Sequence, residues 1–519
     1  AVSGFAGAVN PEHELEVKRI LRDETGLFVT CGHELSDLLN FKTRAQTAVL
    51  NARIIPRLAK LLEDLEAVLL RRGIKAPIVV VKGDGSLVSK EVALERPVET
   101  ILSGPAASVA GARYLTRRKN AIVVDMGGTT TDTAMLHNGS VRLCATGSNV
   151  GGFKTHVKAL EIRTTGLGGD SFIAWHHNEF EIGPRRVAPM AWLGMHAPDT
   201  HRALDFLVKQ LDEYRGSTRP LQILTQTAHT DGTSLTAPEA EIVRLLRERP
   251  CSLQELAART DAFHRGFLPL ARLEENFIIQ RCGLTPTDLL NASDGFDLWN
   301  KKASRRMCEI FSAITGIKIE ELVADLLHAV VKKLALEILR KQLDEKTDPD
   351  KLHGCEAAQM LIANWLNGGG PHFSVKVKMH RPVIGIGAPV HYFLSRAAAL
   401  LGAEAIFPEH AEVANAIGAI TSHIKVQRQV RIKPDAESGF IVEGLAGAKQ
   451  FADLDQATAY AEKELVRLVR AAGRMAGTSA LAVELNTEDQ VPATSTGSQV
   501  FLARTITAQL IGKPDKVRI

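Results

Sequence analysis

The stretch AIVVDMGGTTTDTAML, residues 121–136, decides the predicted fold of this chain. A four-residue apolar run leads into Asp125, and Gly127 and Gly128 follow, then three threonines and Asp132. An apolar, β-branched run is typical of a buried strand, and a double glycine lets the backbone turn sharply. The stretch therefore predicts two strands joined by a tight turn of glycine and threonine.

The turn between these two strands has the composition of a phosphate-binding loop. Backbone N–H groups around a double glycine can converge on an anion, and threonine hydroxyls add further donors. Asp125 and Asp132 flank the turn, so we predict that they are catalytic. Asp125 is also the predicted contact to Mg²⁺ through a water molecule, because Mg²⁺ keeps most of its hydration shell. The competing interpretation is a plain hairpin turn that binds nothing.

Two further glycine runs follow segments that are predicted to be extended. TTGLGGDSF occupies residues 164–172, and VIGIGAPV occupies residues 383–390 and precedes a predicted helix. Either run alone is a weak signal, because such glycines are common in turns. A glycine turn between a strand and a helix can nevertheless admit a flat nucleoside ring against the backbone.

The segments before residue 121 predict an α/β fold. IVVV, residues 78–81, is a continuous β-branched run that predicts a strand buried on both faces, and Asn40 can cap a long helix. SGPAASVAGA, residues 103–112, predicts a helix of small residues against which another segment packs closely. Asp84 and Gly85 follow the predicted strand where ligands of α/β sheets often bind, so they are candidate substrate contacts. A simple turn explains them equally well.

Length and composition limit the class of protein. A chain of 519 residues is too long for one hydrophobic core, so several domains are expected. The net charge of +4 is spread without a run of like charges, and no apolar stretch reaches the about 18 residues that span a bilayer. We therefore expect a cytoplasmic protein with neither a membrane nor a nucleic-acid partner. The six cysteines have no CxxC spacing, which argues against a disulfide or zinc framework.

Taken together, the three glycine runs resemble the ATPase superfamily of actin, hexokinase and the heat-shock chaperones. The chain is also similar to the hydantoinase A/5-oxoprolinase family, which includes N-methylhydantoinase and the acetone carboxylase β subunit. The residues that carry this similarity are NPEHE (10–14), GDGSLV (83–88), RPVETILSGPAASVAGA (96–112), VDMGGTTTD (124–132), GLGGDS (166–171), GLTPTD (283–288) and EVANAIGAI (412–420).

The resemblance assigns a role to each run. It implies that ATP phosphates contact Gly127, Gly128, Thr129, Thr130, Gly168, Gly169 and Asp170, and that adenosine contacts Gly385, Gly387, Ala388 and Pro389. It also implies that ATP and Mg²⁺ serve to phosphorylate a carbonyl oxygen of a cyclic amide, hydantoin-like or 5-oxoproline-like, or of a related carbonyl substrate. The activated substrate is then hydrolysed or carboxylated, often with a hydantoinase B-type subunit, and the protein is expected to be a homo-oligomer.

The expected fold class is an α/β, actin/hexokinase-like (ribonuclease H-like) ATPase core with additions. The expected segments are a remainder of the first actin-like half with the hinge helix (1–117), the second half with the phosphate-loop hairpins (118–187), a mainly helical, winged-helix-like insert (188–294), the second half continued with the adenosine-side turn (295–428), and a small α+β C-terminal domain (429–519). Family chains begin with another phosphate loop, GIDVGGTxTD, which does not precede Ala1, so we expect a fragment that is inactive alone.

The insert supports a second hypothesis of a different class. Thr236 lies three residues before Glu239 and Ser252 precedes another helical pattern, so both can cap helices. A nucleotide-responsive regulatory or scaffold protein could use such a module. Its candidate recognition segment, residues 263–276, mixes basic residues with two glutamates, a poor surface for DNA phosphates.

Overall fold

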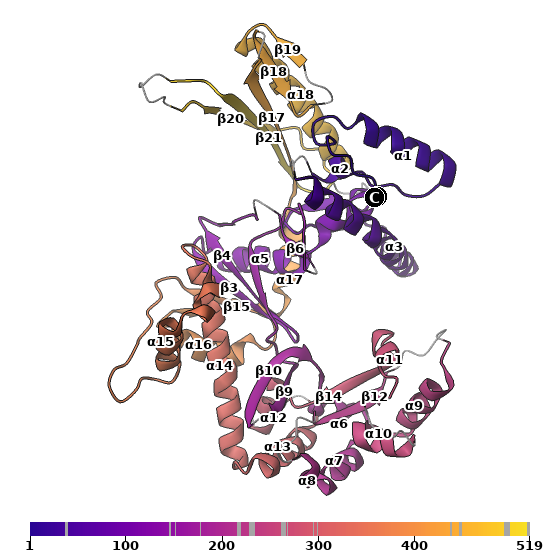
Figure 1. Cartoon of the computed structure of the whole chain (residues 1–519), viewed down its shortest axis with the longest axis vertical. Helices are drawn as coiled ribbons and strands as arrows, with labels where there is room; N and C mark the ends of the chain where they lie inside the picture. The colour runs from indigo at the N-terminus through magenta and orange to yellow at the C-terminus, as the bar shows by residue number, and fades with distance from the viewer. Residues whose placement is uncertain are drawn as a thin grey trace. The chain divides into compact units, whose positions relative to one another are not determined.

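The chain forms two compact units in the computed structural model (Figure 1). Unit 1 contains residues 1–117, 140–161 and 413–519, and unit 2 contains residues 118–139 and 162–412. The structure describes residues 1–36, 40–144, 147–150, 152–176, 178–214, 220–227, 234–260, 266, 268–293, 295–297, 299–435, 438–445, 449–492 and 499–515. Each unit combines helices with β-sheet, which agrees with the predicted α/β class at the level of a mixed α/β fold.

Unit 1 is built around a sheet in which β17 is the central strand. Its described helices are α1 (Glu12–Thr25), α2 (Gly32–Leu35), α3 (Phe41–Arg71), α4 (Lys90–Glu95), α5 (Ser103–Thr116), α17 (Ala414–Thr421), α18 (Leu454–Met475) and the 3-10 helix η1 (Pro97–Thr100). Its sheet strands are β1 (Val79–Val81), β2 (Leu87–Ser89), β17 (Ile424–Pro434), β18 (Phe440–Glu443), β19 (Lys449–Phe451), β20 (Val483–Gln490) and β21 (Ala503–Gly512). β17 pairs antiparallel with β18 and β21, and α18 packs its buried face on these strands (Figure 1).

Two helices of unit 1 approach each other at backbone distance. A Cβ added to Gly111 of α5 would lie 1.9 Å from the carbonyl oxygen of Ala414, and one added to Gly418 of α17 would lie 1.8 Å from the carbonyl oxygen of Ala107. No side chain fits such a gap, so glycine is required at both positions. The prediction of a closely packed small-residue helix is confirmed, and its partner is α17.

In unit 2, β16, β15, β3 and β4 of a second sheet pair in this order, and β8 also pairs with β4. The strands are β3 (Ala121–Met126), β4 (Thr131–His137), β8 (Ile162–Thr165), β15 (Val383–Ile386) and β16 (Ala405–Ile406). β15 runs parallel to β3 and β16, and β4 runs antiparallel to β3 and β8. The described helices nearest this sheet are α14 (Ile319–Leu343) and α16 (Val390–Leu400). The 3-10 helix η3 (Pro349–Gly354) and α15 (Glu356–Leu366) lie between these two helices in the sequence.

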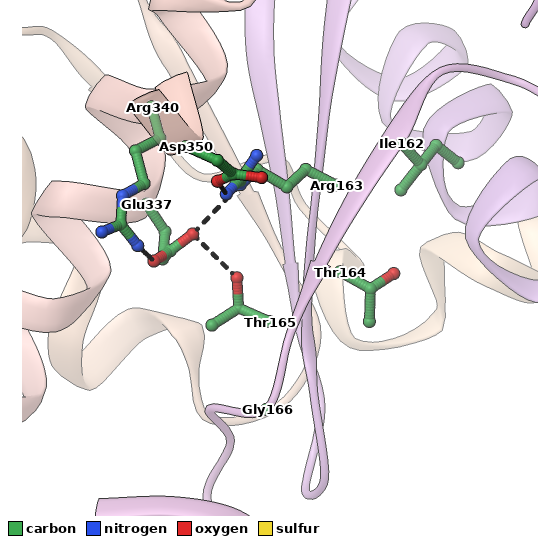
Figure 2. Close-up of a pocket in the computed structure, with 8 residues that line it drawn as sticks. All are labelled: Ile162, Arg163, Thr164, Thr165, Gly166, Glu337, Arg340 and Asp350. Carbon is green, nitrogen blue, oxygen red and sulfur yellow. Dashed lines mark hydrogen bonds and ion pairs between the residues drawn. The ribbon is translucent and has the colours of Figure 1, made fainter. Parts of the chain in front are cut away.

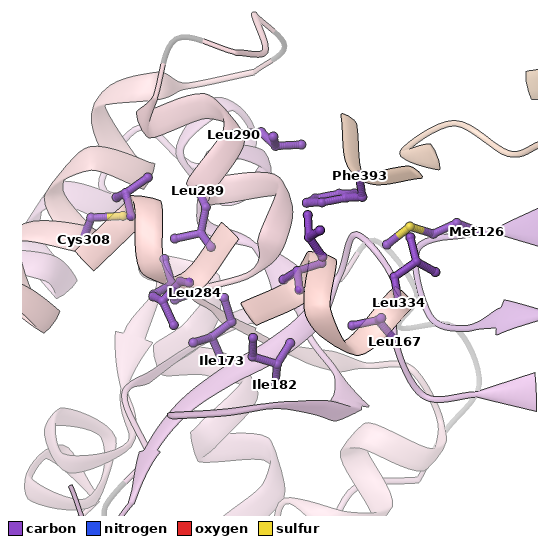
Figure 3. Close-up of a cluster of buried hydrophobic side chains, with 14 of the residues drawn as sticks. Met126, Leu167, Ile173, Ile182, Leu284, Leu289, Leu290, Cys308, Leu334 and Phe393 are labelled. Atoms are coloured by element: carbon purple, nitrogen blue, oxygen red, sulfur yellow. The ribbon is translucent and has the colours of Figure 1, made fainter. Parts of the chain in front are cut away.

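A single hydrophobic cluster joins this sheet to the helices of unit 2. Met126 of β3, Leu167, Leu334 of α14 and Phe393 of α16 are each at most 1% exposed and pack in the same cluster (Figure 3). The hairpin of β9 (Ser171–His176) and β10 (Glu179–Arg186) adds Ile173 and Ile182 to it. Close packing of this kind resists small displacements, so the turns that leave this sheet rest on a rigid base.

Residues 188–294, the segment predicted to be a winged-helix-like insert, contain helices around a small four-stranded sheet. Its helices are α6 (Met190–His196), α7 (Thr200–Lys209), α8 (Leu211–Tyr214), α9 (Ala237–Glu248), α10 (Leu253–Arg259), α11 (Ala271–Glu275) and α12 (Pro286–Ala292), and its strands are β11 (Ala188–Pro189), β12 (Gln222–Gln226), β13 (Cys251–Ser252) and β14 (Ile279–Gly283). α13 (Lys301–Thr315) packs against α12 and α6. The capping box of Thr236 and Glu239 and the Ser252 cap are confirmed.

The winged-helix assignment itself stays a prediction. Residues 261–265 and 267, which cover part of the predicted recognition segment, lie outside the described residues. Among the described helices of both units, none is long and apolar enough to cross a membrane.

Candidate functional site

The turn between β3 and β4 is a tight hairpin with unused donors at its tip. Met126 pairs with Thr131, and the N–H of Gly127 donates to the carbonyl oxygen of Thr130 at 2.9 Å. Within the described part of the chain, the N–H groups of Gly128, Thr129 and Thr130 have no hydrogen-bond acceptor. A backbone N–H group without a partner is a strong hydrogen-bond donor. Three successive donors of this kind can together bind an anion.

The second glycine run lies directly behind this tip. The N–H of Gly169 donates to the carbonyl oxygen of Gly127 at 3.0 Å, and the N–H of Asp170 donates to that of Gly128 at 2.7 Å. A Cβ added to Gly168 would lie 2.4 Å from the Gly128 oxygen, so glycine is needed for this approach. The second run therefore stabilises the hairpin turn. The N–H groups of Gly169 and Asp170 already donate to this turn.

The third glycine run begins where β15 ends beside β3. Ile386 pairs with Asp125, and the next residue, Gly387, has a φ of +92°. A Cβ added to Gly387 would lie 2.2 Å from the carbonyl oxygen of Met126 and 3.0 Å from Oδ1 of Asp125. The structure thus brings together three runs, of which the third lies more than two hundred residues after the other two in the sequence.

Two carboxylates and a hydroxyl form a row across the sheet beside this tip. Asp125 pairs with Asp132 and Asp132 pairs with Thr164, and directly paired residues project to the same face. The Thr164 hydroxyl donates to Oδ1 of Asp132 at 2.5 Å. Burial, together with the charge of Asp125, raises the pKa of Asp132, although the Thr164 hydrogen bond opposes this shift. Bringing a cation to this row would relieve the repulsion between the two carboxylates.

The buried carboxylate of Asp288 fixes the helix that contacts the second glycine run. The N–H and the hydroxyl of Thr287, at the start of α12, donate to the carbonyl oxygen of Gly169 at 3.0 and 2.8 Å. The next residue, Asp288, is fully buried, and its carboxylate accepts from the N–H of Ala191 at 2.8 Å and from the Ser304 hydroxyl at 2.7 Å. Burial raises the pKa of Asp288. Asp288 therefore ties α12, and through it Gly169, to α6 and α13.

The opposite face of β8 borders a polar groove of about 530 Å³. Figure 2 shows Arg163 and Thr165 directed toward Glu337 of α14, with Thr164 on the other side of the strand. Glu337 is 5% exposed and accepts from the Thr165 hydroxyl at 3.0 Å and from Arg340, while Arg163 also pairs with Asp350. The charges that line this groove neutralise one another, so it stabilises β8 against α14 and η3.

Asp84 and Gly85, the predicted substrate contacts, form the turn between β1 and β2 of unit 1. The Asp84 carboxylate accepts from the Ser86 N–H at 3.0 Å and from the Ser86 hydroxyl at 2.6 Å, and it pairs with Lys82. Burial opposes its ionisation, but Lys82 and Ser86 outweigh burial and lower the pKa of Asp84. These contacts explain the residue as part of the turn, and its substrate role stays a prediction.

Positive charge in the insert is largely paired. Arg272 pairs with Glu239, Arg259 with Glu248 and Arg249 with Glu255. A nucleic-acid backbone would have to displace these carboxylates before it could bind the same guanidinium groups.

The sequence analysis assigned no role to three residues that the structure places at this site, although each lies in one of the quoted runs. Thr164 contacts Asp132 only because β4 and β8 pair, and no local pattern shows that pairing. Thr287 and Asp288 could have been found, because Thr285 and Asp288 have the spacing of a capping box, which the structure contains.

Comparison with known proteins agrees with the motifs at this site. A model of the hydantoinase/oxoprolinase family matches residues 44–190, which include the first two glycine runs. Caprolactamase subunit alpha from Pseudomonas jessenii is 29% identical over 192 residues, 36% of this chain and 27% of that protein. The 5-oxoprolinase of Saccharomyces cerevisiae is 32% identical over 182 residues, 34% of this chain and 14% of that protein.

A likeness in fold extends over almost the whole chain. A nucleotide-free structure of acetone carboxylase, described as part of ATP-dependent acetone carboxylation, aligns with a TM-score of 0.56 at 14% identity. The alignment covers 98% of this chain and 63% of that one, so the chain spans less than two thirds of these relatives. The likeness to the hydantoinase/oxoprolinase family therefore rests on residues 44–190 and on two sequence relatives that match about a third of the chain.

Proposed function

We propose that unit 2 binds ATP at the junction of its three glycine runs and belongs to the actin-like class of ATPase folds. The observation that carries this proposal is the approach of Gly128 to Gly168 and of Gly387 to Met126, which only glycine permits. The free N–H groups of residues 128–130 would receive phosphate oxygens, and the turn of residues 385–389 would receive the adenosine. The second run supports the phosphate site by holding the hairpin.

Asp125 and Asp132 suit a hydrated magnesium ion. They are oxygen donors, they lie side by side beside the free N–H groups, and their mutual repulsion favours a divalent cation between them and the phosphates. When bound, Mg²⁺ would neutralise phosphate charge. The chain's own part is to hold two carboxylates and three N–H donors in fixed positions, which is the contribution that phosphoryl transfer needs most.

We propose that this ATP activates a carbonyl substrate by phosphorylation of its oxygen. An amide carbonyl is a poor electrophile, and its nitrogen is a poor leaving group, so a stable lactam needs such activation before water attacks it. Two sequence relatives are named for cyclic amides, caprolactam and 5-oxoproline, and the structural relative is named for a carboxylation. A B-type partner subunit is part of the proposal, since one relative is itself named as a subunit.

Calorimetric titration of Mg·ATP into the 519-residue chain tests the nucleotide site. Asp125→Asn removes one charge at constant shape and should weaken binding of Mg·ATP at least tenfold, whereas Asp297→Asn, an 89% exposed carboxylate of the same unit, should leave it unchanged. Equal weakening by both variants, or binding that is indifferent to Asp125, would contradict the proposed site.

The reaction is tested separately by ADP release. We expect no ADP release from this chain alone. With the family's N-terminal phosphate loop supplied, we expect a cyclic amide such as 5-oxoproline or hydantoin to raise the rate of ADP release over that with ATP alone, and a linear amide of the same size to raise it less. Binding of Mg·ATP without stimulation by any cyclic amide or ketone, also in the presence of a B-type subunit, would retain the nucleotide site and reject the proposed substrates.

A further inference from the structure

Three metal-binding side chains meet near the N-terminus of unit 1, outside the candidate site of unit 2. The carboxylate of Glu14, the thiol of Cys31 and the imidazole of His33 place one ligand atom each within 4.8 Å of the other two. Glu14 is 2% exposed and Cys31 is fully buried, while the His33 side chain is 18% exposed. Two of the three side chains are therefore buried in the protein, and solvent reaches the cluster only at His33.

The fold builds a specific pocket for the Glu14 carboxylate. Among the residues of α1, only Glu14 is buried, although it is a charged residue on an otherwise exposed helix. Its Oε1 accepts from the N–H of Gly4 at 2.7 Å, and a Cβ added to Gly7 would lie 2.0 Å from the same atom. Its Oε2 accepts from the N–H of His33 at 2.9 Å. Burial disfavours the charge of this group, but these donors outweigh burial and lower the pKa of Glu14, so it is ionised at neutral pH.

The other two ligands are presented by the start of α2. Cys31 precedes this helix, and its Sγ lies 3.3 Å from the carbonyl oxygen of Glu14. Nδ1 of His33 lies 2.7 Å from Oε2 of Glu14. The orientation of the helix start is held by Glu34, which accepts from the N–H of Cys31 at 3.0 Å and pairs with Lys18 of α1. Burial raises the pKa of Cys31 to about 11, so this thiol is an unreactive donor until a metal displaces its proton.

We propose that Glu14, Cys31 and His33 bind one zinc ion. A thiolate, an imidazole and a carboxylate form a mixed S, N and O donor set that zinc accepts, whereas calcium and magnesium select oxygen donors alone. One thiolate and one carboxylate neutralise the ion's two charges, which removes the cost of an isolated buried charge. Three protein ligands leave a fourth position for water at the exposed edge beside His33.

The geometry requires only small movements. With metal–ligand bonds of about 2.0 to 2.3 Å, neighbouring ligand atoms around a tetrahedral zinc ion lie roughly 3.3 to 3.8 Å apart. The contact between His33 and Glu14 must open from 2.7 Å, and side-chain rotation supplies such a shift. The bound ion would link α1 to α2. It would also fix the Glu14 carboxylate, which the segment before α1 contacts at Gly4. The simpler alternative is a hydrogen-bonded cluster without metal, in which Cys31 stays protonated.

Metal content and cobalt spectroscopy distinguish these alternatives. The 519-residue chain, purified without a histidine tag, should contain about one zinc per chain by mass spectrometry of the metal. After zinc is removed and Co²⁺ is added, a thiolate-to-cobalt charge-transfer band should appear. Cys31→Ser and His33→Ala should lower zinc content at least tenfold and abolish the band, whereas Cys355→Ser and His372→Ala, both exposed in unit 2, should do neither.

X-ray absorption at the zinc edge is measured on the unsubstituted chain, so its result does not depend on whether the variants fold. We expect one sulfur ligand at about 2.3 Å and nitrogen or oxygen ligands at about 2.0 to 2.2 Å. Absence of stoichiometric zinc after growth with added zinc, a shell without sulfur, or a cobalt band that survives Cys31→Ser would overturn the proposal.

Discussion

Gly387→Ala is expected to disrupt the junction of the glycine runs without removing any charged group. The residue has a φ of +92°, and the new Cβ would lie 2.2 Å from the carbonyl oxygen of Met126 at the end of β3. Gly316→Ala is the matched control in the same unit, because Gly316 has a φ of +76° with nothing within 4 Å of the added Cβ. The two variants share the backbone strain and differ in the steric contact.

The structure supplies the magnitude of the difference. A non-glycine residue with such a positive φ costs about 1 to 3 kcal/mol of stability. Inserting a methyl group into an occupied space costs a further 1 to 3 kcal/mol or so. We therefore expect about 2 to 6 kcal/mol of destabilisation for Gly387→Ala and about 1 to 3 kcal/mol for Gly316→Ala. The turn of residues 385–389, for which we propose adenosine binding, must also move by roughly 1 Å from β3 to reach a normal contact distance, so affinity for Mg·ATP should fall at least tenfold in Gly387→Ala and not in Gly316→Ala.

Urea unfolding followed by tryptophan fluorescence measures this difference in the right unit. The four tryptophans of the chain all belong to unit 2 and are Trp175, Trp192, Trp299 and Trp365. The fluorescence transition therefore reports unit 2 without a contribution from tryptophans elsewhere. Equal unfolding midpoints for the two variants, or equal affinity for Mg·ATP, would refute the inferred close contact between Gly387 and Met126.

Two further predictions concern one charge and one helix contact. The pKa of Asp132 is raised in the folded chain, so the native state binds more protons just above the ordinary aspartate value and unit 2 should lose stability as pH rises through that range. Asp132→Asn keeps an acceptor for Thr164 and should flatten this part of the fluorescence-monitored stability profile; an unchanged slope would contradict the assignment. Gly418→Ala should destabilise unit 1 by about 1 to 3 kcal/mol in circular dichroism, whereas Gly104→Ala, whose added Cβ meets nothing closer than 3.9 Å, should not; equal effects would refute the tight contact of α5 with α17.

Local patterns predicted the elements that carry the site, because their signals are short-range. The apolar run before Asp125 and the double glycine after it predicted the hairpin of β3 and β4, which the structure contains with Asp125 opposite Asp132. The caps at Asn40, Thr236 and Ser252 were predicted on the same local grounds and are present.

One strand prediction was wrong in its burial. The run at residues 78–81 was expected to be buried on both faces, but β1 is three residues long, half-buried, and at the end of its sheet. A continuous apolar run has the same composition in a central strand and in an edge strand, because only the partners of the strand decide how much of it is covered.

The sequence by itself determined the likeness of residues 44–190 to the hydantoinase/oxoprolinase family, the hairpin of β3 and β4, and the small residues of α5. Each of these features is contained in a short run of neighbouring residues. Only the tertiary structure decided that Gly168 packs against Gly128 and that Thr164 hydrogen-bonds to Asp132. It also decided that Asp288 fixes the start of α12, which contacts Gly169. The proximity of Glu14 to Cys31 and His33 likewise depends on how α1 packs on α2. These contacts join residues that are far apart along the chain, so no short sequence pattern indicates them. They form because of strand pairing and core packing, which depend on the whole fold.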